Sequence, residues 1–208
     1  MSFIIKQEAK GDFTPAPAGN HPAVCVGIVD IGMQFKEYSG KVTHEMIVLW
    51  ELPYEINEAD ETLPVTISKF YTVSLYEMSN LYQDLTSWRG RAFTGDELAG
   101  FDLSNIINAA CLLNVVHEPT QSGVIKAKVK GITPLPKGME KPQHRTQKLI
   151  CFNMEESSLE DYEALPSWLK KFVDKAQNKI AFDSRTMRPN QSGNFVTEES
   201  PMTEEMPF

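Results

Sequence analysis

The stretch from Pro22 to Phe35 constrains the fold of this chain more than any other. β-Branched residues dominate it, which favours a strand, and glycines at positions 27 and 32 interrupt it. Glycine inside a strand commonly marks a bulge or a tight bend. We therefore expect one long, bent strand that serves two sheets, as a small barrel requires.

A hairpin partner for this strand is predicted at 42–52. After a turn-like segment at 36–41, the residues alternate so that Met46, Val48 and Trp50 share one face. We expect Trp50 to lie in the core. A third strand, rich in β-branched and aromatic residues, is predicted at 65–74.

The periodicity then changes to that of a helix. Apolar residues recur at helical spacing over 78–88 and end with Trp88, which we also expect in the core. Thr94 and Glu97 have the spacing of a capping box, which predicts a short helix to about Gly100. The remaining predicted elements are a short turn at 103–108, a buried strand at 109–117, a strand at 124–132, a strand at 148–154 and a helix at 168–176.

Three strands, a helix and two strands follow one another as in the OB-fold, a five-stranded Greek-key barrel. We predict a mainly β protein with an OB-like barrel at 22–155, in which 77–108 is a helical insert. An irregular leader (1–21), a C-terminal helix on the barrel (156–180) and a disordered linker with an acidic tail (181–208) complete the chain. An ordinary α+β sandwich remains the alternative.

The charge is distributed unevenly. The formal net charge is −8, but the last twelve residues alone hold four carboxylates, and without them 24 acidic and 20 basic residues remain. Between Thr120 and Ile150 there are seven cations and one acid, a local charge of +6. Charges are screened beyond about 10 Å in ordinary salt, so this local excess determines which partner binds there.

The 124–132 strand carries the clearest binding pattern. Lys126, Lys128 and Lys130 occupy alternate positions and therefore share one face, with apolar residues on the other. We predict that this face contacts the phosphates of single-stranded DNA; a merely solubilising face is the alternative. The cationic segment continues through Lys137, Lys141, Arg145 and Lys148.

Aromatic and guanidinium groups extend the predicted site. Proteins that bind single strands combine a basic groove with aromatic rings on which bases stack. We assign the stacking role to Phe35, Tyr38, Phe70 and Tyr71. Arg89 and Arg91 flank a glycine and are candidate phosphate contacts, although a pairing with Asp84, Asp96 or Glu97 is equally compatible with the sequence.

No enzymatic pattern stands out. The chain has no phosphate loop, nucleophile elbow or His-Glu-x-x-His motif, so we expect neither catalysis nor a cofactor. The acidic run Glu55, Glu58, Asp60 and Glu61 is more typical of a solvated loop than of a Mg²⁺ site. The histidines are scattered, and Cys25, Cys111 and Cys151 are expected to be small buried residues of a reducing compartment.

We expect a cytoplasmic protein that does not insert into a membrane. No apolar run approaches the roughly 18 to 20 residues that span a bilayer, and the first residues contain no basic region before an apolar one.

The tail from Thr197 to Phe208 is acidic and ends in Met206, Pro207 and Phe208. Glu204 and Glu205 precede this tip. The tail resembles that of bacterial single-stranded-DNA-binding proteins, which is acidic and ends in a similar hydrophobic-Pro-Phe tip. The body is more similar to the single-domain binding proteins of bacteriophages, which leaves the oligomeric state open between a monomer and a homo-oligomer.

The resemblance implies a non-enzymatic protein that coats single-stranded DNA in replication, recombination and repair, in a bacterial host cytoplasm if it is phage-encoded. It also implies that the five residues 204–208 recruit replication and recombination proteins. The alternative is a structural or adaptor protein of a phage, which holds a host enzyme through the tail without touching DNA.

Overall fold

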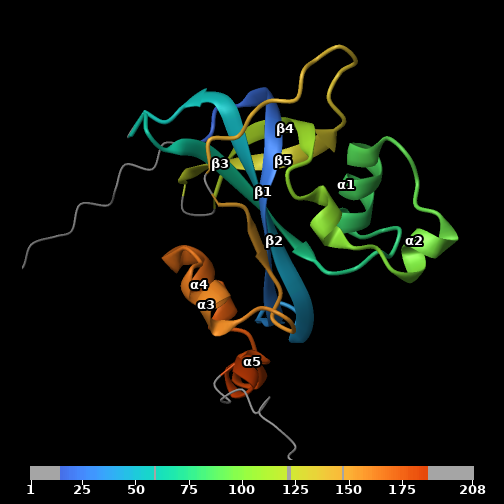
Figure 1. Cartoon of the computed structure of the whole chain (residues 1–208), viewed down its shortest axis with the longest axis vertical. Coiled ribbons are helices and arrows are strands. Elements are labelled where there is room, and N and C mark those ends of the chain that lie inside the picture. The colour runs from blue at the N-terminus through green and yellow to red at the C-terminus, as the bar shows by residue number, and fades with distance from the viewer. Residues whose placement is uncertain (1–14, 59, 121–122, 147, 187–208) are drawn as a thin grey trace, which may run out of the picture.

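The computed structural model describes residues 15–186 except 59, 121, 122 and 147, and it is mainly β (Figure 1). The elements follow the predicted order closely. In chain order they are β1 (Gly19–Lys36), β2 (Lys41–Ile56), β3 (Pro64–Thr72), α1 (Asn80–Arg89), α2 (Gly95–Ala99), the 3-10 helix η1 (Leu103–Ile106), β4 (Ala110–Pro119), β5 (Ile125–Thr133), β6 (Ile150–Phe152), α3 (Leu159–Glu163), α4 (Ser167–Val173) and α5 (Lys179–Thr186).

The strands of the described residues form one sheet in the order β3-β2-β1-β4-β5. Neighbouring strands in this order are antiparallel, whereas β6 pairs in parallel with β1. The two end strands, β3 and β5, also lie close to each other, so the sheet curves back on itself. Helix α1 contacts both of these end strands.

Strand β1 bends at its two internal glycines, as the sequence predicts. Its register with β2 shifts between Cys25 and Gly27 and again between Asp30 and Gly32. Gly32 has a φ of +72°, and a Cβ there would lie 2.4 Å from the Sδ of Met154. Only glycine fits this conformation and this contact. The bends let one edge of β1 pair first with β4 and then with β6.

The inner face of the sheet encloses the main core. Met46, Val48 and Trp50 alternate along β2 and are buried. Trp88 of α1 lies against Trp50, with ring centroids 6.0 Å apart, and its indole N–H donates to the carbonyl of Ala110 at 2.9 Å. Both tryptophans are therefore core residues, as predicted.

A second core lies on the outer face of the β1–β2 hairpin. Ile47 and Leu49 of β2 point into it, and α3 to α5 cover it (Figure 1). We expected a single C-terminal helix, but the chain forms three short helices. Pro166 lies between α3 and α4, and a turn at 174–178 separates α4 from α5. Phe182 is buried in α5, so the predicted linker boundary at 181 is wrong.

No helix within the described residues is long and apolar enough to cross a membrane.

Candidate nucleic-acid interface

The three lysines of β5 are exposed, as the alternation predicts. Two of them form ion pairs with Glu118 of β4, Lys128 at 2.7 Å and Lys130 at 2.6 Å. These two ammonium groups lower the pKa of the Glu118 carboxyl to about 2, so it is ionised at neutral pH. Lys126 forms no ion pair with any residue that the structure describes. The lysine face therefore carries a net charge of +2 instead of +3.

An aromatic cluster spans β3 and α4. Phe70 of β3 lies edge-on to Phe172 with ring centroids 5.0 Å apart, and Phe172 is edge-on to Trp168 at 6.4 Å. Phe70 and Trp168 remain 44% and 41% exposed. We call these three residues the aromatic cluster. Exposed aromatic rings that are held by their neighbours suit base stacking, because little side-chain freedom is lost on binding.

Of the three residues of this cluster, the sequence predicted a stacking role for Phe70 alone. Trp168 and Phe172 were expected on the apolar stripe of a helix, where Leu169 and Val173 are indeed buried. The stripe is wider than the core requires, because Trp168 remains 41% exposed. Their contact with Phe70 joins residues that are about one hundred positions apart, which no local pattern predicts.

Phe70 and the lysine face lie on two strands that contact each other, β3 and β5. Phe70 and the three lysines are all exposed, so none of these side chains is buried in the core.

Tyr71 does not belong to this surface, which corrects the prediction. The alternation of β3 turns Tyr71 inward, where only 3% of it is exposed. Its hydroxyl donates to Asp84 of α1 at 2.7 Å, and Lys69 pairs with the same carboxylate at 2.6 Å. Burial and the nearby Asp84 raise the pKa of Tyr71. Tyr71 therefore holds α1 on the sheet.

Phe35 and Tyr38 are exposed but are not near the lysine face. They lie at the turn between β1 and β2, at one end of β1, whereas β4 and β5 pair beside the other end (Figure 1). The sequence could not predict this separation, because it depends on which part of β1 pairs with β4.

Arg145 has a structural role. Its guanidinium donates to the carbonyls of Glu61 and Leu63 at 3.2 and 3.1 Å. Its backbone N–H donates at 2.6 Å to Glu51, a fully buried carboxylate that also accepts hydrogen bonds from Thr146. Arg145 is therefore not available to a phosphate and instead fixes the loop before β6 to the sheet.

Arg89 and Arg91 pair with an acidic side chain, which is the alternative to phosphate contact that the sequence left open. Both bind Glu97, with Arg91 donating two hydrogen bonds at 2.7 and 3.0 Å. These hydrogen bonds lower the pKa of Glu97. Arg89 also stacks on Phe93, 4.3 Å from the ring centroid. The two guanidinium groups thus hold α2 against the end of α1.

The other predicted cations are exposed. Lys137 and Lys141 form no ion pair with a described residue, and Lys148 is near enough to Asp161 to help lower the pKa of its carboxyl. The predicted partner-binding residues lie outside the described residues. These are Glu204, Glu205, Met206, Pro207 and Phe208.

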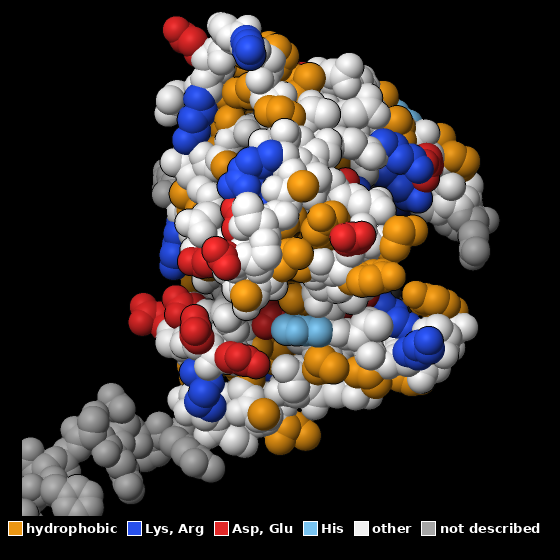
Figure 2. Space-filling model, turned by 90° about the vertical axis from the view of Figure 1, so that its right-hand side faces the viewer, with side chains coloured by type: hydrophobic (Ala, Val, Ile, Leu, Met, Phe, Trp, Pro, Cys, Tyr) orange, Lys and Arg blue, Asp and Glu red, His pale blue; other side chains and the backbone are white. Residues whose placement is uncertain are grey.

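An acidic cavity lies away from the lysine face. It has a volume of about 530 Å³, and its floor is apolar, with Ile28, Met46 and Phe152. Figure 2 shows the hollow with a histidine in view and acidic side chains gathered to the left of it. The ionisable residues that line it are Asp30, His44, Asp102, Cys151, Glu155 and Glu156.

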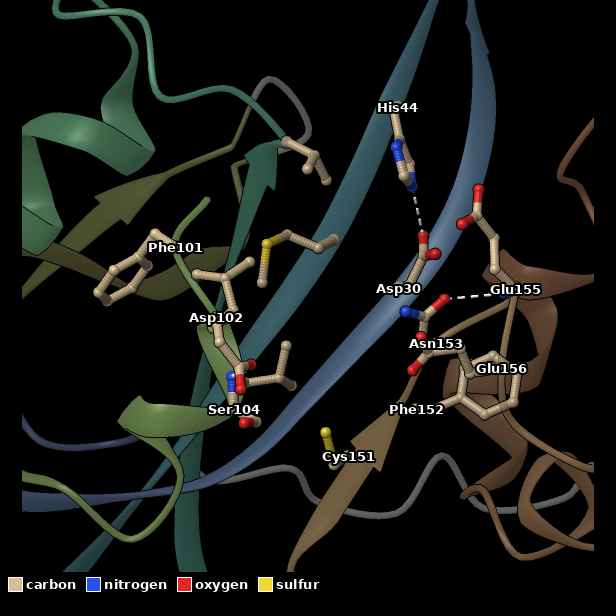
Figure 3. Close-up of a pocket in the computed structure, with 14 residues that line it drawn as sticks. Asp30, His44, Phe101, Asp102, Ser104, Cys151, Phe152, Asn153, Glu155 and Glu156 are labelled. Carbon is tan, nitrogen blue, oxygen red and sulfur yellow. Dashed lines mark hydrogen bonds and ion pairs between the residues drawn. The ribbon is translucent and has the colours of Figure 1, made fainter. Parts of the chain in front are cut away.

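Two chain segments face each other across this cavity. Asp102 and Ser104 come from the η1 segment, and Glu155 and Asn153 from the segment after β6, with Asp30 between them on β1 (Figure 3). His44 contacts Asp30 at 2.8 Å. Among the described residues no group of three or more His, Cys, Asp or Glu side chains is placed to hold a metal ion.

The cysteine prediction is only partly correct. Cys25 and Cys111 are buried, and burial raises the pKa of the Cys25 thiol to about 12. Cys151 is exposed at the cavity, where burial of part of the side chain and the nearby acids raise the pKa of its thiol. Cys151 is thus a weak nucleophile despite its exposure.

No protein-family model matches this chain, and no curated protein matches it at a significant level.

Proposed function

We propose that this chain is a non-enzymatic OB-fold protein that binds single-stranded DNA without sequence specificity. The order β3-β2-β1-β4-β5, the closeness of β3 to β5 and the position of α1 between β3 and β4 support the fold assignment. In OB-folds the surface around strands 2 and 3, with the adjacent 1–2 and 4–5 loops, binds oligonucleotides.

The observation that carries the proposal is the contact between β3, which holds Phe70 of the aromatic cluster, and β5, which holds three exposed lysines. Phe70 and Trp168 of this cluster are each more than two fifths exposed. Stacked bases contribute roughly 1 to 3 kcal/mol each without selecting a sequence, and lysines add an attraction to phosphates that depends on salt. This combination fits a single strand better than a duplex, whose bases are already stacked.

The tail supports a further part of the proposal. We infer that Glu204 to Phe208 recruit replication and recombination proteins, because an apolar tip behind a run of carboxylates suits an apolar pocket with a basic rim. The protein would then keep unwound DNA single-stranded while it brings enzymes to it.

Titration with oligo(dT) tests DNA binding directly. Among the three tryptophans, Trp50 and Trp88 are buried, so quenching by stacked bases reports on Trp168. We expect oligo(dT) to quench the fluorescence, and we expect Trp168→Phe to remove most of the quenching. Phenylalanine still stacks, so the anisotropy of labelled oligo(dT) should show an affinity within a few-fold of the wild type.

Tyr54→Phe is the matched control, because Tyr54 is an exposed aromatic residue away from the aromatic cluster. An oligonucleotide of mixed sequence and equal length tests for lack of sequence preference. If labelled oligo(dT) shows no anisotropy change at low salt, the proposal of DNA binding is wrong and an adaptor function remains.

A further inference from the structure

We propose that the acidic cavity binds the β4–β5 hairpin of a second copy of this chain. The cavity and the hairpin lie on different parts of the surface, and their chemistries are complementary. We use "basic hairpin" for residues 123–130 of that hairpin.

The cavity has the chemistry of a site for a cationic, partly apolar segment. Four carboxylates line it, those of Asp30, Asp102, Glu155 and Glu156, and no lysine or arginine is among its lining residues. Asp30 and Asp102 accept backbone N–H groups and so are fixed in place, whereas Glu155 and Glu156 are exposed at the rim. The apolar floor and the volume of about 530 Å³ suit side chains rather than a single ion.

The basic hairpin is a segment of this kind. Val124 and Ile125 are 57% and 50% exposed, so two adjacent apolar side chains at the start of β5 are available for burial. Lys126 follows them and forms no ion pair with a described residue. Insertion of this segment would bury the two apolar side chains on the floor and place Lys126 at the carboxylates.

The hairpin does not line the cavity of its own chain. None of residues 123–130 is among the residues that line it. Backbone pairing with β4 holds the hairpin in place from Ile125 onward. We therefore assign the contact to two molecules.

Other occupants fit the cavity less well. Its carboxylates repel the phosphates of DNA and the acidic tail of the chain alike. Two different surfaces meet in the proposed contact, so it is heterologous, and molecules would associate head to tail.

Sedimentation velocity of the full chain tests this proposal. At about 50 mM salt we expect the average mass to rise with concentration above that of the 23.4 kDa monomer, and to fall again at about 0.5 M salt, where exposed charges are screened. Two variants each remove one half of the contact: Lys126→Glu in the hairpin, and Glu155→Lys with Glu156→Lys at the cavity rim. Each should weaken association at least about tenfold.

An equimolar mixture of the two variants gives the decisive result. Each variant retains the half that the other lacks, so the mixture should regain association that neither variant shows alone. Lys137→Glu controls for a charge reversal elsewhere on the exposed surface, and circular dichroism confirms folding. A wild type that stays monomeric at low salt overturns the proposal, and so does a mixture that stays monomeric.

Discussion

Phe70 and Tyr71 are neighbours in β3, yet their side chains serve opposite purposes. Phe70 points outward to Phe172 and remains 44% exposed, whereas Tyr71 is buried against Asp84. Because successive side chains of a strand point to opposite faces, only one of two adjacent aromatic residues can line an outer surface. The same rule leaves Phe70 available to the binding surface that we propose and places Tyr71 in the core.

Substitutions at these two positions should therefore separate binding from stability. Phe70→Ala is expected to weaken oligo(dT) binding by about 1 to 3 kcal/mol, because it removes one stacking ring. Tyr71→Phe is expected to leave the affinity unchanged and to lower the free energy of unfolding by about 1 kcal/mol, through loss of the hydrogen bond to Asp84. Anisotropy and urea unfolding of both variants measure the two effects. Equal loss of affinity in both would contradict the assignment.

At the scale of an element, Glu118 of β4 partly neutralises the positive charge of β5. Two of its three lysines pair with this one carboxylate, whose pKa is near 2. The usual pKa of a glutamate side chain is about 4.3. Because the pKa of Glu118 is lower in the folded state, its ionised form stabilises the fold above about pH 4.3. This stabilisation is lost as the pH falls toward 2. Glu118 is therefore ionised at neutral pH, and in the binding mode that we propose, phosphates would compete with it for two lysines.

Substitutions in this hairpin should change DNA binding in opposite directions. Replacing Lys126, Lys128 and Lys130 with Ala should weaken binding and reduce the slope of log K against log salt by about 0.7 for each lost phosphate contact, hence by about 2. Glu118→Gln should strengthen binding at low salt, since it releases two ammonium groups. Oligo(dT) anisotropy over a salt series measures both.

Lys137→Ala with Lys141→Ala is the control for the general loss of positive charge, because both lysines are exposed outside β5. An unchanged slope in the triple variant would show that the lysine face is only a solvated surface.

At the scale of the whole molecule, charge is separated into regions of opposite sign. The net charge is −8, although the segment 120–150 carries +6 and the last twelve residues carry four carboxylates. The acidic cavity adds a second negative region within the described residues. The DNA binding that we propose would therefore depend on where the cationic surface lies and on what competes for it, since the total charge is repulsive.

Deletion of residues 197–208 should strengthen oligo(dT) binding at low salt, because the tail has the same sign as DNA and competes for the lysine face. The gain should disappear at high salt, where the competition is screened. Replacing Glu198, Glu199, Glu204 and Glu205 with Gln retains the tip and should reproduce the gain. If neither change alters the affinity for oligo(dT) at low salt, the tail does not compete for the lysine face.

Local patterns in the sequence were sufficient to predict most strands and helices of the sheet and its cover. The alternation of β2, the helical spacing up to Trp88 and the glycines of β1 correspond to structure because each reflects a backbone geometry that few residues decide. The lysine face of β5 was predictable for the same reason. The Thr94 capping box was also predicted and is present.

Only the tertiary structure decided which of these residues act together. It placed Tyr71 inside, bound Arg145 to the 61–63 turn, set Phe35 and Tyr38 at the far end of β1, and brought Trp168 and Phe172 to Phe70. The acidic cavity between η1 and the segment after β6 was equally beyond local patterns. Each depends on contacts between distant parts of the chain, which the packing of the whole sheet determines and no short stretch of sequence encodes.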